Sequence, residues 1–336
     1  MKTYTLLIRT GLVWLVACAI GVILSPIVIS GAKKLKAGQP ILSYVDQHKG
    51  KQGTPTFGGF IFLIPAVLVT FAFTIGQGFT IGRIAAIVML SFSVLGFLDD
   101  FIKIKTKDNM GLRPYQKIIG QLAIAVVVAF YAYKNAEIGS AVNIPFYGRT
   151  VDFGYLYIPF AVIVFLSLSN CVNLTDGLDG LASNCSIYFL LAYIVVLFLE
   201  VATVGGDSSL ILFSAALLGG VFAFLLVNTN KASVFMGDTG SLALGGASAA
   251  IALFSKHPFL VLFVGIMYVI SGISIILQVT YFKVTHGKRI FLMAPYHHHL
   301  EKKGLSEAQI CNIYASVTFM MGVISIISVA VGKNGL

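Results

Sequence analysis

Long apolar stretches separated by short polar loops recur along the whole chain. A membrane-spanning helix needs about 20 mostly apolar residues, and the pattern predicts ten such helices. They are expected at residues 11–31, 58–76, 82–98, 116–134, 156–172, 184–204, 208–227, 239–254, 258–281 and 308–331. Because these stretches are continuous and do not alternate, they indicate helices and not the strands of a membrane barrel. We therefore predict an all-α, polytopic membrane protein with a single domain over residues 1–336.

The composition supports a membrane location. The chain is 57% hydrophobic and only 11% charged, whereas soluble domains carry about 25% charged residues. The first apolar stretch has no obvious small-residue cleavage site, so we interpret it as a retained helix and not as a signal peptide. The four cysteines show no CxxC spacing, so they predict neither a disulfide framework nor a zinc site.

The distribution of positive charge predicts the orientation. Most of the 23 Lys and Arg residues lie in alternate loops, at residues 33–51, 103–117, 231 and 283–303. The positive-inside rule places these loops in the cytoplasm and both termini outside the inner membrane. The net charge of +10 does not predict nucleic-acid binding, because basic residues beside membrane segments attract anionic lipid and phosphate headgroups.

Acidic residues gather in the same loops as the basic ones. Nine of the 13 are found there: Asp46, Asp99, Asp100, Asp108, Asp176, Asp179, Asp238, Glu301 and Glu307. Carboxylates at the membrane edge are costly and often functional, although an Asp at a helix end can simply be solvated. The group therefore predicts a cation site on the cytoplasmic side.

Three of these loops contain the most informative runs. Asp99 and Asp100 end the third apolar stretch, and Lys103 follows on the same side of the helix, where it could hold a phosphate. The run 173–180 contains two Asp-Gly steps, which favour turns that expose backbone groups. Asp238 lies just before an expected helix start, where its alternative role is an ordinary N-cap.

These oxygen ligands favour Mg²⁺ over a softer metal. Mg²⁺ prefers carboxylates and commonly bridges them to substrate phosphates. The run His297, His298 and His299 suggests zinc, but three consecutive side chains rarely converge on one ion. We therefore expect a Mg²⁺ site and no zinc site.

The loop motifs resemble one enzyme family across nearly the whole chain. The matching runs are Asp46-Gln-His-Lys-Gly-Lys-Gln-Gly-Thr-Pro-Thr-Phe-Gly-Gly59, Leu98-Asp-Asp100, residues 173–182, residues 228–246 and Met293-Ala-Pro-Tyr-His-His-His-Leu-Glu301. The chain resembles the phospho-N-acetylmuramoyl-pentapeptide transferases, which belong to the polyprenyl-phosphate N-acetylhexosamine-1-phosphate transferases. The resemblance implies transfer of phospho-N-acetylmuramoyl-pentapeptide from UDP-N-acetylmuramoyl-pentapeptide to undecaprenyl phosphate, which yields lipid I and UMP in peptidoglycan biosynthesis. It also implies a ten-helix topology and a homodimer.

The resemblance assigns roles to individual residues. Asp238 and Asp100 would bind Mg²⁺, Asp99 would be the base for the lipid phosphate, and His297 would assist catalysis. The implied substrate-binding residues are Lys51, Thr56, Lys103, Lys117, Asn173, Asp176, Gly177, Leu178, Asp179, Asn228, Phe235, Gln278 and His298. Phe235 would stack on uracil, since aromatic faces commonly bind bases, although an isolated aromatic residue at a membrane edge is more often an interfacial anchor. Gln278 could instead hydrogen-bond another helix.

Three alternatives remain at the level of sequence. An aspartate could act as a covalent nucleophile, but we favour direct attack because a phosphate monoester with a second pKa of about 6 is already a competent nucleophile near neutral pH. A sister transferase would move N-acetylglucosamine phosphate, which the triple-histidine run disfavours. A secondary transporter would place its charges near the membrane midplane, whereas these charges cluster in loops.

Overall fold

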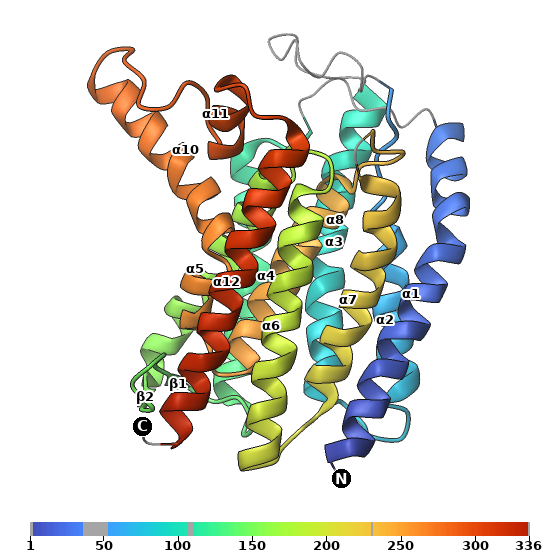
Figure 1. Ribbon diagram of the computed structural model, residues 1–336, viewed down its shortest axis with the longest axis vertical. Coiled ribbons are helices and arrows are strands. Elements are labelled where there is room, and N and C mark those ends of the chain that lie inside the picture. The colour runs from blue at the N-terminus through green and yellow to red at the C-terminus, as the bar shows by residue number, and fades with distance from the viewer. Residues whose placement is uncertain (1–2, 36–52, 107–110, 230, 335–336) are drawn as a thin grey trace.

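The computed structural model describes residues 3–35, 53–106, 111–229 and 231–334. Within these ranges the fold is a helical bundle with one small hairpin (Figure 1). The elements are α1 (Thr3–Lys34), α2 (Phe60–Phe73), α3 (Ile81–Thr106), α4 (Pro114–Lys134), β1 (Ala141–Asn143), β2 (Thr150–Asp152), η2 (Gly154–Leu156), α5 (Tyr157–Thr175), α6 (Leu181–Val204), α7 (Ser209–Asn228), α8 (Gly237–Phe254), η3 (Pro258–Leu260), α9 (Val261–Val264), α10 (Ile266–Val284), α11 (Tyr296–Lys302) and α12 (Glu307–Asn334).

The all-α prediction is confirmed, and eight of the described helices are long and apolar enough to cross a membrane. Two further predicted spans correspond to the shorter helix α2 and to α8. The prediction of one continuous helix over 258–281 was wrong. The chain there forms η3 and α9, and α10 begins only after Gly265, because a glycine between α9 and α10 disfavours an uninterrupted helix.

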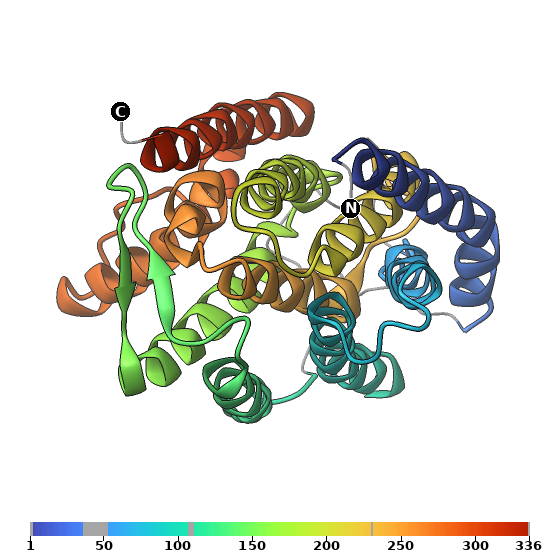
Figure 2. The same ribbon diagram turned by 90° about the horizontal axis from the view of Figure 1, so that it is seen from below.

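Helix α8 lies inside the bundle, surrounded by other helices (Figure 2). Every residue of α8 except Asp238 is buried. Its Gly, Ala and Ser residues let neighbouring backbones approach closely, as small residues do in membrane helix packing. Gly245 faces the backbone of Ser169 on α5, and Gly246 faces the ring of Phe92 on α3. Helix α8 therefore packs against protein along its whole length.

Both termini lie at the same end of the bundle, and α11 lies at the other end (Figure 1). Two basic residues at the terminal end have structural roles. Arg83 donates hydrogen bonds to the carbonyl oxygens of Thr74 and Gly78 at 2.5 Å each, and Arg9 donates to the Phe73 carbonyl at 2.7 Å. These carbonyls lie at or just beyond the C-terminus of α2, where cations are favourable. These hydrogen bonds therefore explain why the two arginines lie at the terminal end of the bundle.

Two small elements fall outside the predicted spans. Strands β1 and β2 pair antiparallel, with Val142 opposite Val151, and form a hairpin at the terminal end of the bundle (Figure 1). Helix α11 contains the triple-histidine run. Both elements are too short to give a clear hydrophobic period.

Candidate active site

The candidate site lies where the last two turns of α3 cross the first turn of α8. Gly96 is the closest approach of the two helices: a Cβ atom there would overlap the backbone carbonyl of Asp238. Because Gly96 has no side chain, the start of α8 can lie directly against the α3 segment that carries Asp99 and Asp100.

Gly96→Ala should therefore destabilise the protein and lower its activity together. Overpacking of this kind costs about 1–3 kcal/mol, and the shift would displace Asp238. Thermal unfolding of the purified protein in detergent, with a turnover assay, is the measurement. The matched control is Gly11→Ala on α1, where a Cβ atom would meet nothing within 4 Å; an equal effect of both substitutions would contradict the explanation.

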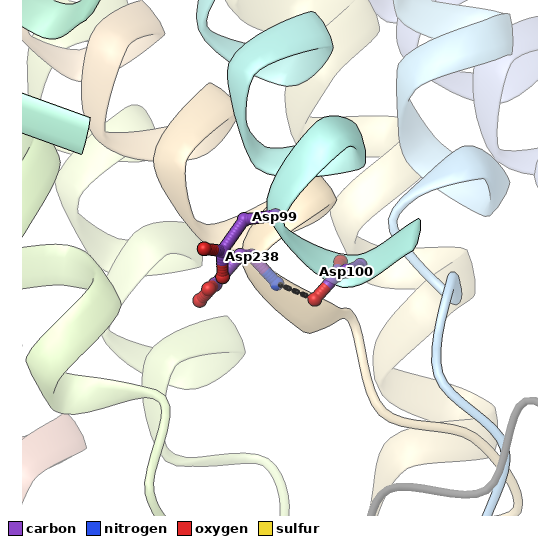
Figure 3. A group of neighbouring side chains, drawn as sticks. All are labelled: Asp99, Asp100 and Asp238. Atoms are coloured by element: carbon purple, nitrogen blue, oxygen red, sulfur yellow. Dashed lines mark hydrogen bonds between the residues drawn. The ribbon is translucent and has the colours of Figure 1, made fainter. Parts of the chain in front are cut away.

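Asp100 caps the N-terminus of α8 from the neighbouring helix. Its Oδ1 accepts a hydrogen bond from the Asp238 backbone N–H at 3.1 Å (Figure 3). Its Oδ2 accepts from the backbone N–H and the hydroxyl of Thr239, at 2.8 and 2.7 Å. The N-cap alternative for Asp238 is therefore wrong: Asp238 lies inside the first turn, and the cap comes from α3.

Asp99 and Asp238 share two lysine ammonium groups. Lys103 Nζ lies 2.6 Å from Asp99 Oδ2 and 2.7 Å from Asp238 Oδ2. Lys117 Nζ, from α4, lies 2.9 Å from Asp238 Oδ2 and 3.8 Å from Asp99 Oδ2. Asp99 Oδ1 also accepts the backbone N–H of Leu112 at 2.7 Å. Three separate helices thus bring two carboxylates and two ammonium groups into one cluster.

The three carboxylates fit the chemistry of a hard divalent cation. Ligand atoms of Asp99, Asp100 and Asp238 all lie within 4.8 Å of one another, and all are oxygens, which Mg²⁺ prefers. Figure 3 shows the Asp99 and Asp238 side chains on one side and Asp100 directed to the start of α8. Among the described residues, these three carboxylates face the two ammonium groups of Lys103 and Lys117, so an added cation would be electrostatically favourable.

Asn173 fixes the other oxygen of Asp238. Its side-chain amide donates to Asp238 Oδ1 and, at 2.8 Å, to the Ser241 hydroxyl. Asp176, three residues further along, lies beside the same cluster: burial, and then the negative charges of Asp238, Asp100 and Asp179, raise the pKa of its carboxyl to about 8. A cation would relieve this repulsion between carboxylates.

Asp179 and Asn228 join loops together and are mostly buried. Asp179 Oδ2 accepts the Ala232 backbone N–H at 2.9 Å. Asn228 Oδ1 accepts the Gly180 N–H at 3.0 Å, and its amide donates to the Val234 carbonyl at 3.0 Å. These contacts position the surrounding loops, and the predicted binding of substrate by both residues stays a prediction. Leu178, also in the predicted set, is buried.

Phe235 is held by a short ribbon of backbone hydrogen bonds. Its N–H donates to the Pro55 carbonyl at 2.9 Å, and its carbonyl accepts the Gly58 N–H at 2.8 Å. Its side chain is partly exposed. Thr56, in the same ribbon, is 3% exposed, and its hydroxyl has no hydrogen-bond partner among the described residues. Lys51, which was predicted to border this cleft, lies outside the described residues.

The short helix α11, which carries the three histidines, lies beside the 173–180 loop. His297 is buried and its ring abuts Gly177, so α11 contacts the 173–180 loop. His298 Nδ1 lies 2.7 Å from Glu301 Oε2, and His299 Nδ1 accepts the Leu292 N–H at 3.1 Å. The three side chains therefore make different contacts, as expected if they do not share one ion.

Gln278 anchors the loop that leads to these histidines. Its Oε1 accepts the N–H groups of Ile290 and Phe291, at 3.1 and 2.9 Å, and its amide donates to the Phe291 carbonyl at 3.2 Å. These contacts are with the loop that follows its own helix and not with another helix, and substrate binding by Gln278 stays a prediction.

Two contributors to the site were not identified from the sequence. Thr239 gives Asp100 two of its three donors, and Ser241 shares the amide of Asn173. The signal was present in the run Gly237-Asp-Thr-Gly-Ser241, because hydroxyl residues at a helix start favour local polar contacts. The sequence does not show that their partners come from α3 and α5.

Comparisons with known proteins show which family the chain is similar to. The family described as Glycosyl transferase family 4 matches residues 83–256. A phospho-N-acetylmuramoyl-pentapeptide-transferase of Clostridium novyi (strain NT) is 41% identical over 322 residues, which are 96% of this chain and 97% of that protein. Proteins of the same name from Clostridium botulinum (strain Alaska E43 / Type E3) and Clostridium perfringens (strain 13 / Type A) are 42% and 45% identical. They cover 94% and 88% of this chain and 94% and 91% of their own lengths.

Proposed function

The chain belongs to the phospho-N-acetylmuramoyl-pentapeptide transferases of glycosyl transferase family 4, and from this premise we propose how its residues perform the reaction. The enzyme transfers phospho-N-acetylmuramoyl-pentapeptide from its UDP carrier to a polyprenyl phosphate, in peptidoglycan biosynthesis. We propose undecaprenyl phosphate as the acceptor, with lipid I and UMP as the products.

The observation that carries the proposal is the cluster of Asp99, Asp238, Lys103 and Lys117. Phosphoryl transfer between two anionic substrates depends mainly on positioning and on neutralising charge. Both ammonium groups lie within 3 Å of a carboxylate oxygen and are only partly exposed, with 19% and 17% of their side chains accessible. They are thus held in fixed positions where substrate phosphates can replace part of their carboxylate contacts.

In the proposed reaction, an oxygen of the lipid phosphate attacks the phosphorus that bears the sugar. A new P–O bond forms to this oxygen, and the bond to the bridging oxygen of the UDP diphosphate breaks, which releases UMP. Asp99 accepts the proton when the lipid phosphate is monoprotonated. Lys103 and Lys117 stabilise the charge that develops on the phosphoryl oxygens. This single displacement requires no covalent aspartyl intermediate.

We propose that Asp238 and Asp100 hold Mg²⁺, which supplies charge neutralisation of the diphosphate when bound. A carboxylate has about four lone-pair sites. The contacts described above occupy three of those on Asp100, and one on its Oδ1 remains. Asp100 would therefore contribute one ligand while it continues to cap α8. His297 and His298 would border the sugar or diphosphate.

The decisive experiment supplies purified protein with Mg²⁺, undecaprenyl phosphate and either UDP-N-acetylmuramoyl-pentapeptide or UDP-N-acetylglucosamine. We expect UMP and lipid I with the first nucleotide only. Release of UMP with the second alone would instead identify the sister activity. The cluster lies near the ends of α3 and α8 and not at the middle of a span, which disfavours a transporter.

Phe235→Ala should weaken nucleotide binding with little loss of maximal turnover. The lost stacking is worth about 1–3 kcal/mol per base, which corresponds to a rise in Kd of about 5- to 150-fold. Calorimetric titration with UDP-N-acetylmuramoyl-pentapeptide and with free UMP is the measurement. Phe79→Ala, at the opposite end and 83% exposed, is the matched control; unchanged affinity in Phe235→Ala would refute the stacking role.

We further propose that the face with the candidate site is cytoplasmic. A protein without Cys18, Cys171, Cys185 and Cys311 would carry one new cysteine, either Lys303→Cys or Ala136→Cys. In intact spheroplasts, a thiol reagent that cannot cross the membrane should label only Ala136→Cys. Labelling of Lys303→Cys alone would reverse the orientation.

A further inference from the structure

A cavity lined by polar side chains lies at the end of the bundle that carries both termini, far from the carboxylate cluster. Its volume is about 320 Å³, and it lies between the hairpin, the end of α6, the start of η3 and the end of α12. Figure 2 shows the turn of the hairpin beside the C-terminal end of α12. Gly148 in this turn packs against the backbone of Gly332, so the cavity is built by contacts between distant segments.

The inner wall of the cavity carries a carboxylate that the transferase reaction does not use. Glu200 belongs to the last turns of α6, a spanning helix with no other charged residue. Its Oε1 lies 2.7 Å from His257 Nε2, and 21% of its side chain is exposed compared with 5% for His257. Asn143 Nδ2 lies 3.1 Å from the same histidine nitrogen. The histidine thus fixes a carboxylate that remains accessible from the cavity, and carboxylates in spanning segments often mark functional sites.

The outer rim provides the opposite charge. Arg149 lines the cavity, and its guanidinium lies 4.8 Å from the centre of the Tyr147 ring. Tyr147 and the adjacent Phe146 are 63% and 50% exposed. Exposed aromatic residues beside the ends of spanning helices are typical of the headgroup level of a bilayer. A guanidinium at that level is suited to bind phosphate.

We propose that this cavity binds the headgroup of a zwitterionic phospholipid of the phosphoethanolamine type. Arg149 binds the lipid phosphate, and Glu200, oriented by His257, accepts hydrogen bonds from the ammonium group. The occupant is a lipid because the cavity opens beside two spanning helices, α6 and α12, and below two exposed aromatic rings. It is zwitterionic because the described residues that line the cavity include one carboxylate, Glu200, and one guanidinium, Arg149, and a headgroup without an amine would make no use of the carboxylate.

Native mass spectrometry of the purified full-length protein tests the proposal. The protein is equilibrated with equal amounts of phosphatidylethanolamine and phosphatidylglycerol and then released from detergent. We expect wild type to retain phosphatidylethanolamine preferentially. Glu200→Gln should lower that retention by about tenfold, as expected for loss of one charge-assisted contact, and remove the preference. Arg149→Gln should lower retention of both lipids.

Two controls keep the result interpretable. Lys134→Gln is matched to Arg149→Gln, because Lys134 also lies over a tyrosine ring, at 5.5 Å from Tyr133, but does not line the cavity. UMP release should be unchanged in all three variants, which shows that they are folded. Equal retention of the two lipids by wild type, or equal losses in Lys134→Gln and Arg149→Gln, would overturn the proposal. Competition by soluble glycerophosphoethanolamine would show that the headgroup itself is recognised.

Discussion

Asp238→Asn should reduce turnover by about a thousandfold or more, on the scale of losing one main stabiliser of transition-state charge. The amide keeps the shape of the side chain, so α8 should remain capped by Asp100. The variant loses the negative charge that holds the ammonium groups of Lys103 and Lys117, which lie 2.7 and 2.9 Å from Asp238 Oδ2. It also loses the proposed metal ligand. The measurement is UMP release over a range of Mg²⁺ concentrations, together with thermal unfolding.

The matched control is Asp152→Asn, an exposed aspartate on the hairpin, which should retain full turnover. If Asp238→Asn regained wild-type turnover at ordinary Mg²⁺ concentrations, its carboxylate would not be a metal ligand. If it failed to fold, a chemical role could still be separated by Asn173→Ala, which keeps the Asp238 carboxylate but removes the amide contacts to Asp238 Oδ1 and to the Ser241 hydroxyl.

Asp99→Asn should reduce turnover by about tenfold for each pH unit below 6, because without the base only the dianion of the lipid phosphate, whose second pKa is about 6, can attack, while nucleotide affinity is largely kept. The asparagine oxygen can still accept the Leu112 N–H, which now binds Asp99 Oδ1 at 2.7 Å, so the loop after α3 should stay in place. The substitution removes the negative charge beside Lys103 and the carboxylate that can accept a proton.

The pH dependence distinguishes the two roles of Asp99. The lipid phosphate has a second pKa of about 6, so at higher pH it is a dianion and needs no base. Turnover of Asp99→Asn should therefore recover in part as the pH rises. A loss of turnover that stays constant from pH 5 to 8 would instead assign Asp99 to holding Lys103 in place.

The hydrophobic pattern by itself determined the class of fold and the position of most helices. Spanning helices require about 20 apolar residues, and this requirement is local, so it can be read without knowledge of neighbours. The same pattern did not reveal the interruption at Gly265 or the short helix around His297, because a few residues carry too little periodicity. The sequence also identified Asp99, Asp100 and Asp238 as a group, since all three lie at the ends of predicted spans on one predicted side.

Only the tertiary structure decided which carboxylate does what. The sequence places Asp238 at a helix start, where a cap is the ordinary expectation, yet the cap is Asp100, whose contacts lie 138 and 139 residues away along the chain. This division of roles between Asp100 and Asp238 depends on the close crossing of α3 and α8 at Gly96. It leaves Asp238 to pair with Lys103 and Lys117 instead. Contacts between distant helices are set by packing in three dimensions, and no local propensity encodes them.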